Sequence, residues 1–551
     1  MAYRSVWPSI GLPVVLAVGC GVPLMPLVMG TYKTEALQRF QRHLPAVLVA
    51  IAAILAYLPA LQNGFVLDDK PLVLGNPYIK SWKFLPEMLT EDLWNVWERG
   101  NYWRPAFYLS LALDYSLWGL TALGFHLTNV LIHVFNTALL FLFLRKFTDV
   151  KSAVLGSLLF GLHPIQAHTV SVISTRGDLL AVFFSLLALH AFFGKNVLLL
   201  ALSLALALLS KETAMVLPAV FLAACFIVRR KADWRLIGLS FIIPAIYGAV
   251  RLSLGFSFSL PPSVFSYPAD MPSRMLLVFK VVALYFASLL NLFHLPHPVW
   301  TTTFPTSFSD PSVIGGLAIV VLLAVAIGLS IKKYPIAALG LMWFVICFLP
   351  ISNLKELNQL MAEHWLYLPM VGLSVAFAAG LGALQSSEVR VVKVGIATAV
   401  SVYLVFAALV TREKIKVYED DRSFMMAAVR ANPQVARLYS ILGSTFLAGG
   451  DAETAKELYA RALELDPDDF LANYRTGYFY YNSGEHEKAK LHLEKVLRPD
   501  PPSLFQILVV AHAWEMLGDK EKSRFYYLRA LAVNPHSEHI KKKVAALQAS
   551  P

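Results

Sequence analysis

Two adjacent aspartates, Asp68 and Asp69, stand in the sequence GFVLDDKP shortly after an apolar run, Leu44 to Leu61, of about the length that spans a membrane. Neighbouring carboxylates at the end of a membrane helix cost desolvation energy and repel one another, so a purely structural chain has little reason to place them there. A carboxylate that is held close and partly desolvated can act as general base toward a hydroxyl group. The pair could also be a solvated turn with a helix cap, and the pair alone leaves both interpretations open.

Further ionisable and amide side chains stand near the ends of later apolar runs, on what the alternation of runs predicts to be the same side as the aspartates. Ionisable groups at membrane depth are rare and usually mark a substrate path. Cationic and imidazole groups at a membrane surface can hold the phosphate of a lipid carrier and stabilise it as it leaves. The set consists of Arg104, His126, Asn129, His163, His168, Arg176, Asp178, Lys211, Glu212, Glu363 and His364.

Each of these side chains also has a structural explanation. The alternatives are a hydrogen-bonded network of His126, Asn129 and His133 at helical spacing, a local Arg176–Asp178 pair and an interfacial Lys211–Glu212 pair. Because six separate segments deliver such groups to one side, the pattern favours a shared cavity. Acidic groups for a hydroxyl acceptor, cations for a phosphate and apolar helices for a lipid tail together predict sugar transfer from a polyprenyl-phosphate donor.

The composition is that of a membrane protein with many spans. Hydrophobic residues make up 57% of the 551 residues and charged residues 15%, outside the usual range of soluble proteins. The net charge of +11 sits largely in short basic clusters between apolar runs, as in cytoplasmic loops, so it does not indicate nucleic-acid binding. The three cysteines lie inside apolar segments at unrelated spacings and imply neither a disulfide framework nor a metal site.

The apolar runs predict an all-α membrane domain over residues 44–410 with about 11–12 spans. Basic residues precede Leu44, so Asp68 and Asp69 should emerge on the extracytoplasmic side, in a first outer loop over 62–124. Within that loop, residues 82–120 favour helices along the interface. The later runs are Phe125–Leu144, Ser152–Ile173, Leu179–Phe193, Val197–Leu209, Thr213–Val228, Leu236–Leu254, Met275–Phe293, Val313–Ile331, Ile336–Ile351, Glu363–Leu384 and Val391–Val410.

Two segments do not fit this alternation. The run after Met275–Phe293 ends on Lys332 and Lys333 and must start outside, so either Met275–Phe293 is re-entrant or one span is false. Residues 1–43 are hydrophobic and basic, and they could be an extra span, an uncleaved signal-like segment or a start-site extension.

From about Thr411 the composition is that of a soluble protein, and a repeat of 34 residues follows a linker helix over 411–432. Small residues at fixed points let two helices of a hairpin approach closely, and prolines end each unit; this is the tetratricopeptide pattern. The repeating positions are Pro433, Pro467, Pro501 and Pro535, and Gly450, Gly484 and Gly518. We therefore expect an α-solenoid of about three repeats over 433–551, whose concave face would hold an extended peptide. A dimerisation or spacer module is the structural alternative.

The motif order GFVLDDKP, YWRPAFYL, GFHLTNVLIHV, LHPIQAHTVSVISTRGDLL, SKETAM and EHWLYLP resembles the transmembrane and tetratricopeptide-repeat-containing protein O-mannosyltransferases. These belong to the C-type superfamily of membrane glycosyltransferases. The resemblance covers nearly the whole chain from about residue 44, and the ordered set is specific although each motif is short.

The resemblance implies an inverting transfer of a sugar from a polyprenyl-phosphate donor to Ser or Thr hydroxyls of extracytoplasmic proteins. It implies that Asp68 or Asp69 is the catalytic base, and that Arg104, His163, His168, Arg176, Lys211 and His364 bind the donor and its phosphate. His126, Asn129, Asp178, Glu212 and Glu363 would support the site. Some related enzymes use a divalent metal at an acidic loop motif and others do not, so Asp68 and Asp69 could hold Mg²⁺ or Mn²⁺.

The chain departs from the family pattern at two points. Glu363-His364 stands where the family has Glu-Arg, which weakens an anion-binding role because His is only partly charged near neutral pH. The repeat array is short, which favours a bacterial inner-membrane member with an undecaprenyl carrier and a sugar that need not be mannose. The acidic loop and the repeats would then lie on the periplasmic side.

Three other functions fit parts of the sequence. The acceptor could be a cell-envelope glycan or lipid, or the chain could be a non-catalytic scaffold that recruits envelope proteins through its repeats. A transporter is disfavoured because the membrane segments show no evident internal repeat.

Overall fold

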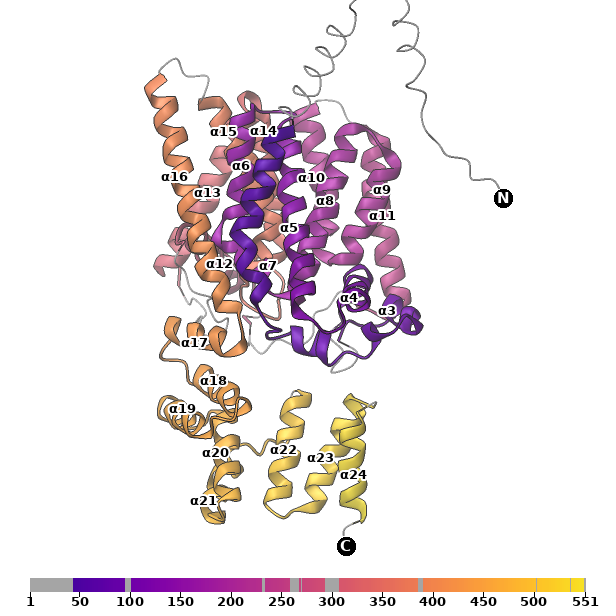
Figure 1. The fold of residues 1–551 in the computed structure, drawn as a ribbon, viewed down its shortest axis with the longest axis vertical. Helices are drawn as coiled ribbons and strands as arrows, with labels where there is room; N and C mark the ends of the chain where they lie inside the picture. The colour runs from indigo at the N-terminus through magenta and orange to yellow at the C-terminus, as the bar shows by residue number, and fades with distance from the viewer. Residues whose placement is uncertain are drawn as a thin grey trace, which may run out of the picture.

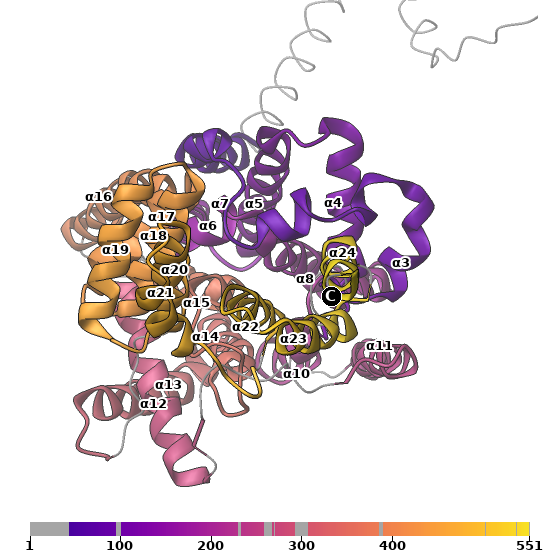
Figure 2. The same cartoon turned by 90° about the horizontal axis from the view of Figure 1, so that it is seen from below.

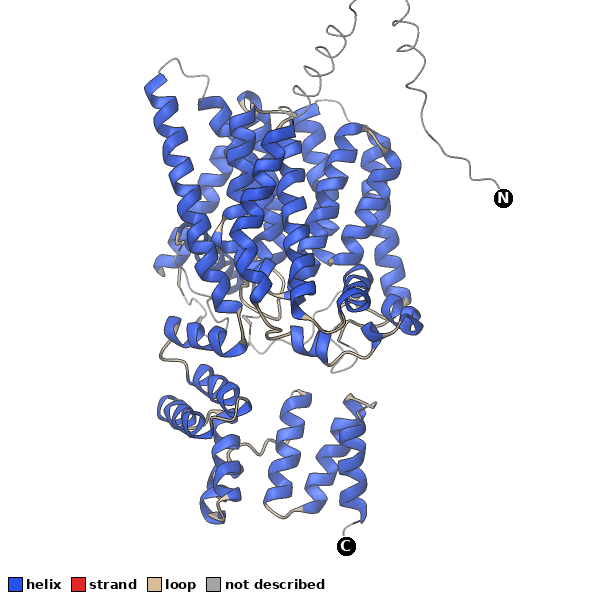
Figure 3. Ribbon diagram, viewed as in Figure 1, coloured by secondary structure: helices blue, strands red, loops and turns tan. Residues whose placement is uncertain are grey.

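The protein was analysed as a computed structural model, which describes residues 43–94, 101–229, 233–257, 267–268, 270–292, 307–384, 390–501, 503–535 and 537–549. The described residues between 43 and 415 form a helical bundle, and a smaller helical array lies at one end of it (Figure 1). The described residues contain helices and no strands (Figure 3). This confirms the predicted all-α class. Residues 1–42, to which the sequence assigned an uncertain role, lie outside the described part.

Among the described residues of the bundle, eight helices are long and apolar enough to cross a membrane. These are His43–Gln62, α5 (Ala122–Leu144), Ile173–Gly194 with α8 (Arg176–Gly194), α11 (Trp234–Ser253), α12 (Met271–Leu290), α13 (Pro311–Lys333), Glu363–Leu384 with α15 (Tyr367–Leu384), and Val391–Tyr418 with most of α16 (Arg390–Ile415). Shorter apolar helices complete it: α6 (Val150–Leu162), α9 (Val197–Ser210), α10 (Leu217–Ala224) between η7 (Glu212–Val216) and η8 (Cys225–Arg229), and α14 (Pro335–Phe348) with η10 (Leu349–Ile351).

The outer surface of the bundle is apolar, as a lipid-facing surface must be. The clearest case is α13, of whose most apolar stretch only 6% is buried inside the protein. Leu322 and Leu329 on this helix are exposed. The protein therefore has the architecture of a polytopic membrane protein.

Helix α12 does not cross the bundle, although it is long enough to do so. Near its start, Arg274 Nη2 donates to Glu356 Oε1 (2.9 Å) in the segment between α14 and α15. Near its end, the Leu289 carbonyl accepts from His163 Nε2 (3.1 Å), directly after α6. Helices α6 and α14 both run toward the face that carries the acidic loop, so both ends of α12 lie at that face. The remaining helices then alternate in direction, and the inconsistency at Met275–Phe293 disappears.

The predicted single run Ser152–Ile173 is broken in the structure. Helix α6 stops at Leu162 because Pro164 cannot continue it, and short turns follow: η5 (Pro164–Gln166), α7 (Ala167–Ser171) and η6 (Ile173–Thr175). His163 caps η5, since its side chain accepts from the Ile165 backbone N–H. The break matters because it folds this stretch back into the end of the bundle.

Between the first span and α5, the chain forms short elements at the same end of the bundle. They are η2 (Lys70–Leu74), η3 (Tyr78–Lys80), η4 (Trp82–Phe84), α3 (Leu85–Thr90) and α4 (Pro105–Trp118). This agrees with interfacial helices over 82–120. Basic residues of the loops, such as Lys146 and Lys332, lie at the opposite ends of their helices.

The C-terminal array consists of helical hairpins. After η12 (Lys416–Tyr418) the helices are α17 (Asp421–Ala431), α18 (Ala436–Ala448), α19 (Ala452–Leu465), α20 (Phe470–Asn482), α21 (His486–Glu494), α22 (Leu504–Met516), α23 (Lys520–Val533) and α24 (Glu538–Ala549). Gly450, Gly484 and Gly518 have positive φ angles between hairpin helices, where glycine is favoured. A Cβ at Gly443 would lie 2.8 Å from the Tyr459 ring, so the small residue is required by close packing. The array lies beneath the end of the bundle that carries α3 and α4 in Figure 1, and in front of it in Figure 2, which looks from below.

Candidate functional site

The acidic loop, residues Asn63–Leu74, gives the two adjacent aspartates different environments. Asp69 is fully buried; its Oδ1 accepts from the Ser174 backbone N–H (2.6 Å) and its Oδ2 from the Val66 N–H (3.3 Å). Asp68 is exposed, and its carboxylate makes no hydrogen bond or ion pair with any described residue. Leu67, just before it, has φ of 49°, a conformation that a non-glycine residue adopts only when its surroundings impose it. Asp69 is thus committed to the fold, whereas Asp68 is available for chemistry.

The surrounding protein raises the pKa of both carboxyl groups. The pKa of Asp69 rises to about 7 because its burial outweighs the opposing effect of backbone N–H groups from Ser174, Ile173 and Val66. The protein around Asp68 raises its pKa to about 6. Since the Asp68 carboxylate itself is exposed, water screens this effect and about 6 is the upper end of the shift. With a pKa of about 6, the Asp68 carboxyl group is mostly ionised at neutral pH and basic enough to accept a proton.

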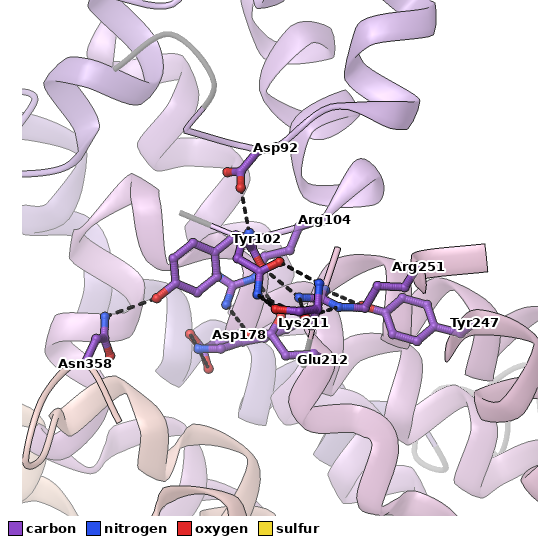
Figure 4. A network of polar contacts seen from close by, with 11 residues as sticks. Asp92, Tyr102, Arg104, Asp178, Lys211, Glu212, Tyr247, Arg251 and Asn358 are labelled. Atoms are coloured by element: carbon purple, nitrogen blue, oxygen red, sulfur yellow. Dashed lines mark hydrogen bonds and ion pairs between the residues drawn. The ribbon is translucent and has the colours of Figure 1, made fainter. Parts of the chain in front are cut away.

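Two ion pairs form a cluster at this end of the bundle (Figure 4). Arg104 binds Glu212 through two hydrogen bonds, Nε to Oε2 at 2.9 Å and Nη2 to Oε1 at 2.5 Å. Lys211 Nζ donates to both oxygens of Asp178, at 2.7 and 2.6 Å. Burial alone lowers the pKa of Arg104, but Glu212 raises it above its ordinary value, while the pKa of the buried Lys211 is lowered although Asp178 opposes the shift. The cluster holds two cations that are each neutralised by a carboxylate.

Tyr102 connects this cluster with the acidic loop. Its ring lies 4.7 Å from the Arg104 guanidinium, and the charge of Asp68 acts on its hydroxyl group. The hydroxyl accepts from Asn358 Nδ2 (3.1 Å), and the backbone N–H donates to Asp92 Oδ2 (3.1 Å), as Figure 4 shows. Asp68 therefore lies within electrostatic range of the ring that covers the Arg104–Glu212 pair.

Two imidazole rings lie next to a third ion pair. The His168 ring stacks on Tyr418 with centroids 5.1 Å apart and meets the edge of the His364 ring at 5.0 Å. Burial, with the nearby Lys414 and Lys211, outweighs the charge of Glu363 and lowers the pKa of His168 to about 4, so this imidazole is neutral at physiological pH. Lys414 Nζ donates to Glu363 Oε1 (2.8 Å), and both side chains are buried. Neutral imidazole can donate one hydrogen bond without adding a charge.

Arg176, which the resemblance placed at the donor, is fully buried and bound by protein groups. It forms an ion pair with Asp114 Oδ2 at 2.6 Å and donates to Asn129 Oδ1 at 2.7 Å. Nη1 donates to the Ser110 carbonyl, and Nη2 also donates to the Phe125 carbonyl. All three guanidinium nitrogens therefore bind protein groups and join the start of α8 to α4 and α5.

His163 is used in the same way. Its Nδ1 accepts from the Ile165 N–H and its Nε2 donates to the Leu289 carbonyl. Burial lowers its pKa to about 4. His133 and Asn129 bind separate groups on neighbouring segments: His133 contacts Tyr367 and Gly161, and Asn129 donates to the carbonyls of Val170 and Val172. His126 Nε2 reaches the Gly64 carbonyl at 3.2 Å, directly beside the acidic loop.

The acidic loop does not fit a divalent metal ion held by both aspartates. Each oxygen of the buried Asp69 carboxylate already accepts a backbone N–H group inside the fold, so only Asp68 offers a carboxylate without protein partners. Within the described residues no group of three or more His, Cys, Asp or Glu side chains could hold a metal. We therefore assign no chemical step to a metal ion.

Some residues at the site were not identified from the sequence. Tyr102 is the first residue of the motif YWRPAFYL but was given no role there, and Asn358 lies in a polar stretch without a motif. Lys414 and Arg251 offered a usable signal, because each is an ionisable residue inside or at the end of an apolar run. Arg251 donates to the Asn101 carbonyl (2.7 Å) and so holds the chain just before Tyr102.

Comparisons with known proteins agree with the motif resemblance. The tetratricopeptide repeat family model matches residues 446–510. Over 494 residues the chain is 25% identical to the protein O-mannosyl-transferase TMTC3 of Mus musculus, which covers 80% of this chain and 53% of that protein. Over 175 residues it is 36% identical to the protein O-mannosyl-transferase Tmtc1 of Drosophila melanogaster, covering 29% of this chain and 20% of that protein.

The chain thus spans about half the length, or less, of these relatives. Among solved structures, the chain is similar to ArnT from Cupriavidus metallidurans bound to undecaprenyl phosphate, with 14% identity, a TM-score of 0.38 and 79% of each chain covered. The two relatives confirm the resemblance to protein O-mannosyltransferases, and the family model confirms the tetratricopeptide assignment.

Proposed function

We propose that this protein is an integral-membrane glycosyltransferase that moves a sugar from a polyprenyl-phosphate donor to a Ser or Thr hydroxyl of an extracytoplasmic protein. The observation that carries the proposal is the contrast between the two aspartates. An exposed, unpartnered carboxylate with a raised pKa acts electrostatically on Tyr102, whose ring lies 4.7 Å from the Arg104 guanidinium, while its neighbour is bound to the fold. A general base must be free to meet its substrate, so Asp68 is the base in this proposal.

The chemistry follows from the charges. Asp68 accepts the hydroxyl proton as the acceptor oxygen attacks the anomeric carbon, and the bond between that carbon and the phosphate oxygen breaks on the opposite side. The attack from opposite the leaving group inverts the anomeric centre. Arg104 and Lys211 would stabilise the charge that develops on the departing polyprenyl phosphate. His168 and His364 would donate hydrogen bonds from neutral rings.

The ion pairs explain how the two cations can remain charged in a buried site before a phosphate binds. An unpaired buried charge is costly, so Glu212 and Asp178 keep Arg104 and Lys211 neutralised while no phosphate is bound. A bound phosphate would share these cations with the carboxylates. The bidentate geometry of Arg104 suits a phosphate as well as a carboxylate.

The distribution of charged loops supports the orientation. Basic residues such as Lys146, Lys195 and Lys332 lie on the face opposite the acidic loop, and such residues favour the cytoplasmic side. The acidic loop and the repeats would accordingly face outward. The names of the relatives support a protein acceptor and mannose as the sugar, and the repeat array supports recognition of an extended peptide.

The test is transfer by cells that carry wild type, Asp68→Asn or Asp69→Asn, with protein levels checked. We expect Asp68→Asn to remove a sugar from envelope or secreted proteins while it accumulates normally, and Asp69→Asn to lower the amount of folded protein. Unchanged glycoproteins in both variants at normal levels would contradict a protein acceptor. A changed cell-envelope glycan or lipid in Asp68→Asn would then identify the acceptor, and no glycosylation change at all would favour the scaffold function.

A further inference from the structure

The acidic loop is held by the segment through which the chain enters the repeat domain. This entry segment, residues 415–421, runs from the end of α16 through η12 to the first residue of α17. Asn63 Nδ2 donates to the Ile415 carbonyl (3.3 Å), and the Gly64 N–H donates to the Glu419 carbonyl (2.9 Å). The two segments are thus joined before the loop reaches its aspartates, although they lie about 350 residues apart in sequence.

Asp421 then binds the loop on both sides of the aspartate pair. Its Oδ1 accepts from the Leu67 backbone N–H at 2.8 Å, and its Oδ2 accepts from Lys70 Nζ at 2.5 Å. Leu67 is the residue with φ of 49°, in the left-handed region that leucine rarely adopts. Because Leu67 directly precedes Asp68, its backbone conformation sets the direction in which the Asp68 side chain leaves the loop.

Asp421 is also fixed to the repeat array. Asp420 caps α17 by accepting from the Ser423 N–H at 2.7 Å. The Arg422 guanidinium lies 4.1 Å from the Phe446 ring of α18, the first helix of the first repeat hairpin. A shift of the first repeat relative to the bundle would therefore move Asp421 and, through Leu67, the exposed aspartate.

The same segment reaches the imidazole rings. Tyr418 stacks on His168, and Lys414, just before the segment, pairs with Glu363. One short stretch of chain thus contacts both the acidic loop and the opposite wall of the candidate site.

We propose that Asp421 is a positioning residue for Asp68, through which the repeat domain sets the geometry of the acidic loop. The proposal rests on the function proposed above for its catalytic consequence, but the coupling itself is a property of the fold. Asp421 touches no reacting atom; it acts by holding Leu67 in its left-handed conformation. The repeat domain is then a part of the active site and more than a tether for the acceptor.

The first measurement is hydrogen–deuterium exchange of the full-length protein in detergent, comparing wild type with Asp421→Ala. We expect faster exchange over residues 63–74 in the variant. Glu413→Ala is the matched control, because this exposed carboxylate just before the entry segment pairs with Lys416 alone among the described residues. It should leave exchange of the acidic loop unchanged. Unchanged loop exchange in Asp421→Ala would overturn the coupling, whatever the protein catalyses.

The second measurement is transfer of mannose from polyprenyl-phosphate mannose to an acceptor peptide. Asp421→Ala should lower kcat about tenfold or more with little change in the KM for the peptide, since the base is displaced while acceptor binding is retained. Asp421→Asn should retain activity within about threefold, because its amide oxygen still accepts the Leu67 N–H.

Adding Leu67→Gly to Asp421→Ala should recover part of the lost kcat, because glycine adopts a positive φ without assistance. A mere loss of folding would not be reversed in this way. Equal turnover in wild type and Asp421→Ala, or equal losses in Asp421→Ala and Asp421→Asn without rescue, would overturn the positioning role. If Asp421→Ala alone does not fold, the kcat values of Asp421→Asn and of Asp421→Ala combined with Leu67→Gly are compared with that of wild type instead. Absence of transfer by wild type would count against the proposed function alone, and the exchange data would still test the coupling.

Discussion

Asp69 and Ser174 are 105 residues apart in sequence and are joined by a hydrogen bond of 2.6 Å from the Ser174 backbone N–H to Asp69 Oδ1. The bond ties the acidic loop to the turn before α8. It turns one of two adjacent, chemically identical residues into a structural element and leaves Asp68 free. Several expected outcomes follow from this difference and from the ion pairs around it.

Replacing the two aspartates should separate stability from activity. Asp69→Ala leaves the buried Ser174 N–H without an acceptor and should lower the free energy of unfolding by about 1–3 kcal/mol. Asp68→Ala removes an exposed, unpartnered group and should change it by about 0.5 kcal/mol or less. Thermal unfolding of the detergent-purified variants measures both effects. A larger loss of stability in Asp68→Ala than in Asp69→Ala would contradict the assignment.

Transfer should depend on pH through Asp68. A general base works only when ionised, so with a pKa raised to about 6, kcat/KM should be constant above that pH and fall as the pH drops through it. The profile is measured with purified protein at saturating donor. An inflection near the ordinary pKa of an aspartate, about 4, would show that the carboxyl group is fully solvated.

Arg104→Lys should weaken use of the donor although the charge is kept. Lysine cannot reproduce the two parallel hydrogen bonds of a guanidinium, and one charge-assisted hydrogen bond is worth about 1.5–3 kcal/mol, or roughly a tenfold to 150-fold change. We expect a loss of this size in kcat/KM for the donor. The exposed Arg461, whose side chain pairs with Glu464 on the repeat surface, provides the control substitution Arg461→Lys. Equal effects of the two substitutions would argue against a phosphate contact at Arg104.

Removing one charge of the Glu363–Lys414 ion pair should cost more stability than removing both. Glu363→Gln leaves the buried Lys414 without a counter-charge and should cost about 3–5 kcal/mol, whereas Glu363→Leu combined with Lys414→Met removes both charges and should cost much less. Unfolding of the single and double variants gives the comparison. Additive losses in the double variant would show that the two side chains do not depend on each other.

The repeat glycines should matter through their backbone conformation. Gly484 has φ of +78° and open space around its Cα, so Gly484→Ala should cost about 1–2 kcal/mol from the left-handed backbone alone. Lys490→Ala, on the exposed side of α21, should be nearly neutral. Unfolding of the repeat array is followed by exchange over 470–494. If Gly484→Ala leaves the free energy of unfolding unchanged, the turn can change its backbone conformation without loosening the hairpin.

The acidic loop and its partners show where sequence reasoning ended. The sequence offered Asp68 or Asp69 as the base and Arg104, Asp178, Lys211 and Glu212 as site residues, and the structure joins the last four in two ion pairs. It did not show that all three guanidinium nitrogens of Arg176 bind protein groups, because those groups come from α4 and α5. Nor did hydropathy show that α12 stays at one face, since a helix of that length and composition could equally cross the bilayer.

The sequence by itself determined the all-α class, the membrane domain, the repeat array and the list of candidate residues. Apolar runs, basic clusters and a period of 34 residues are local patterns, and local patterns can be recognised without knowledge of the fold. Only the tertiary structure decided which aspartate is free, that Asp421 holds Leu67, and which cations are already paired. These properties depend on contacts between segments as many as 354 residues apart, and such contacts produce no recognisable spacing pattern in the sequence.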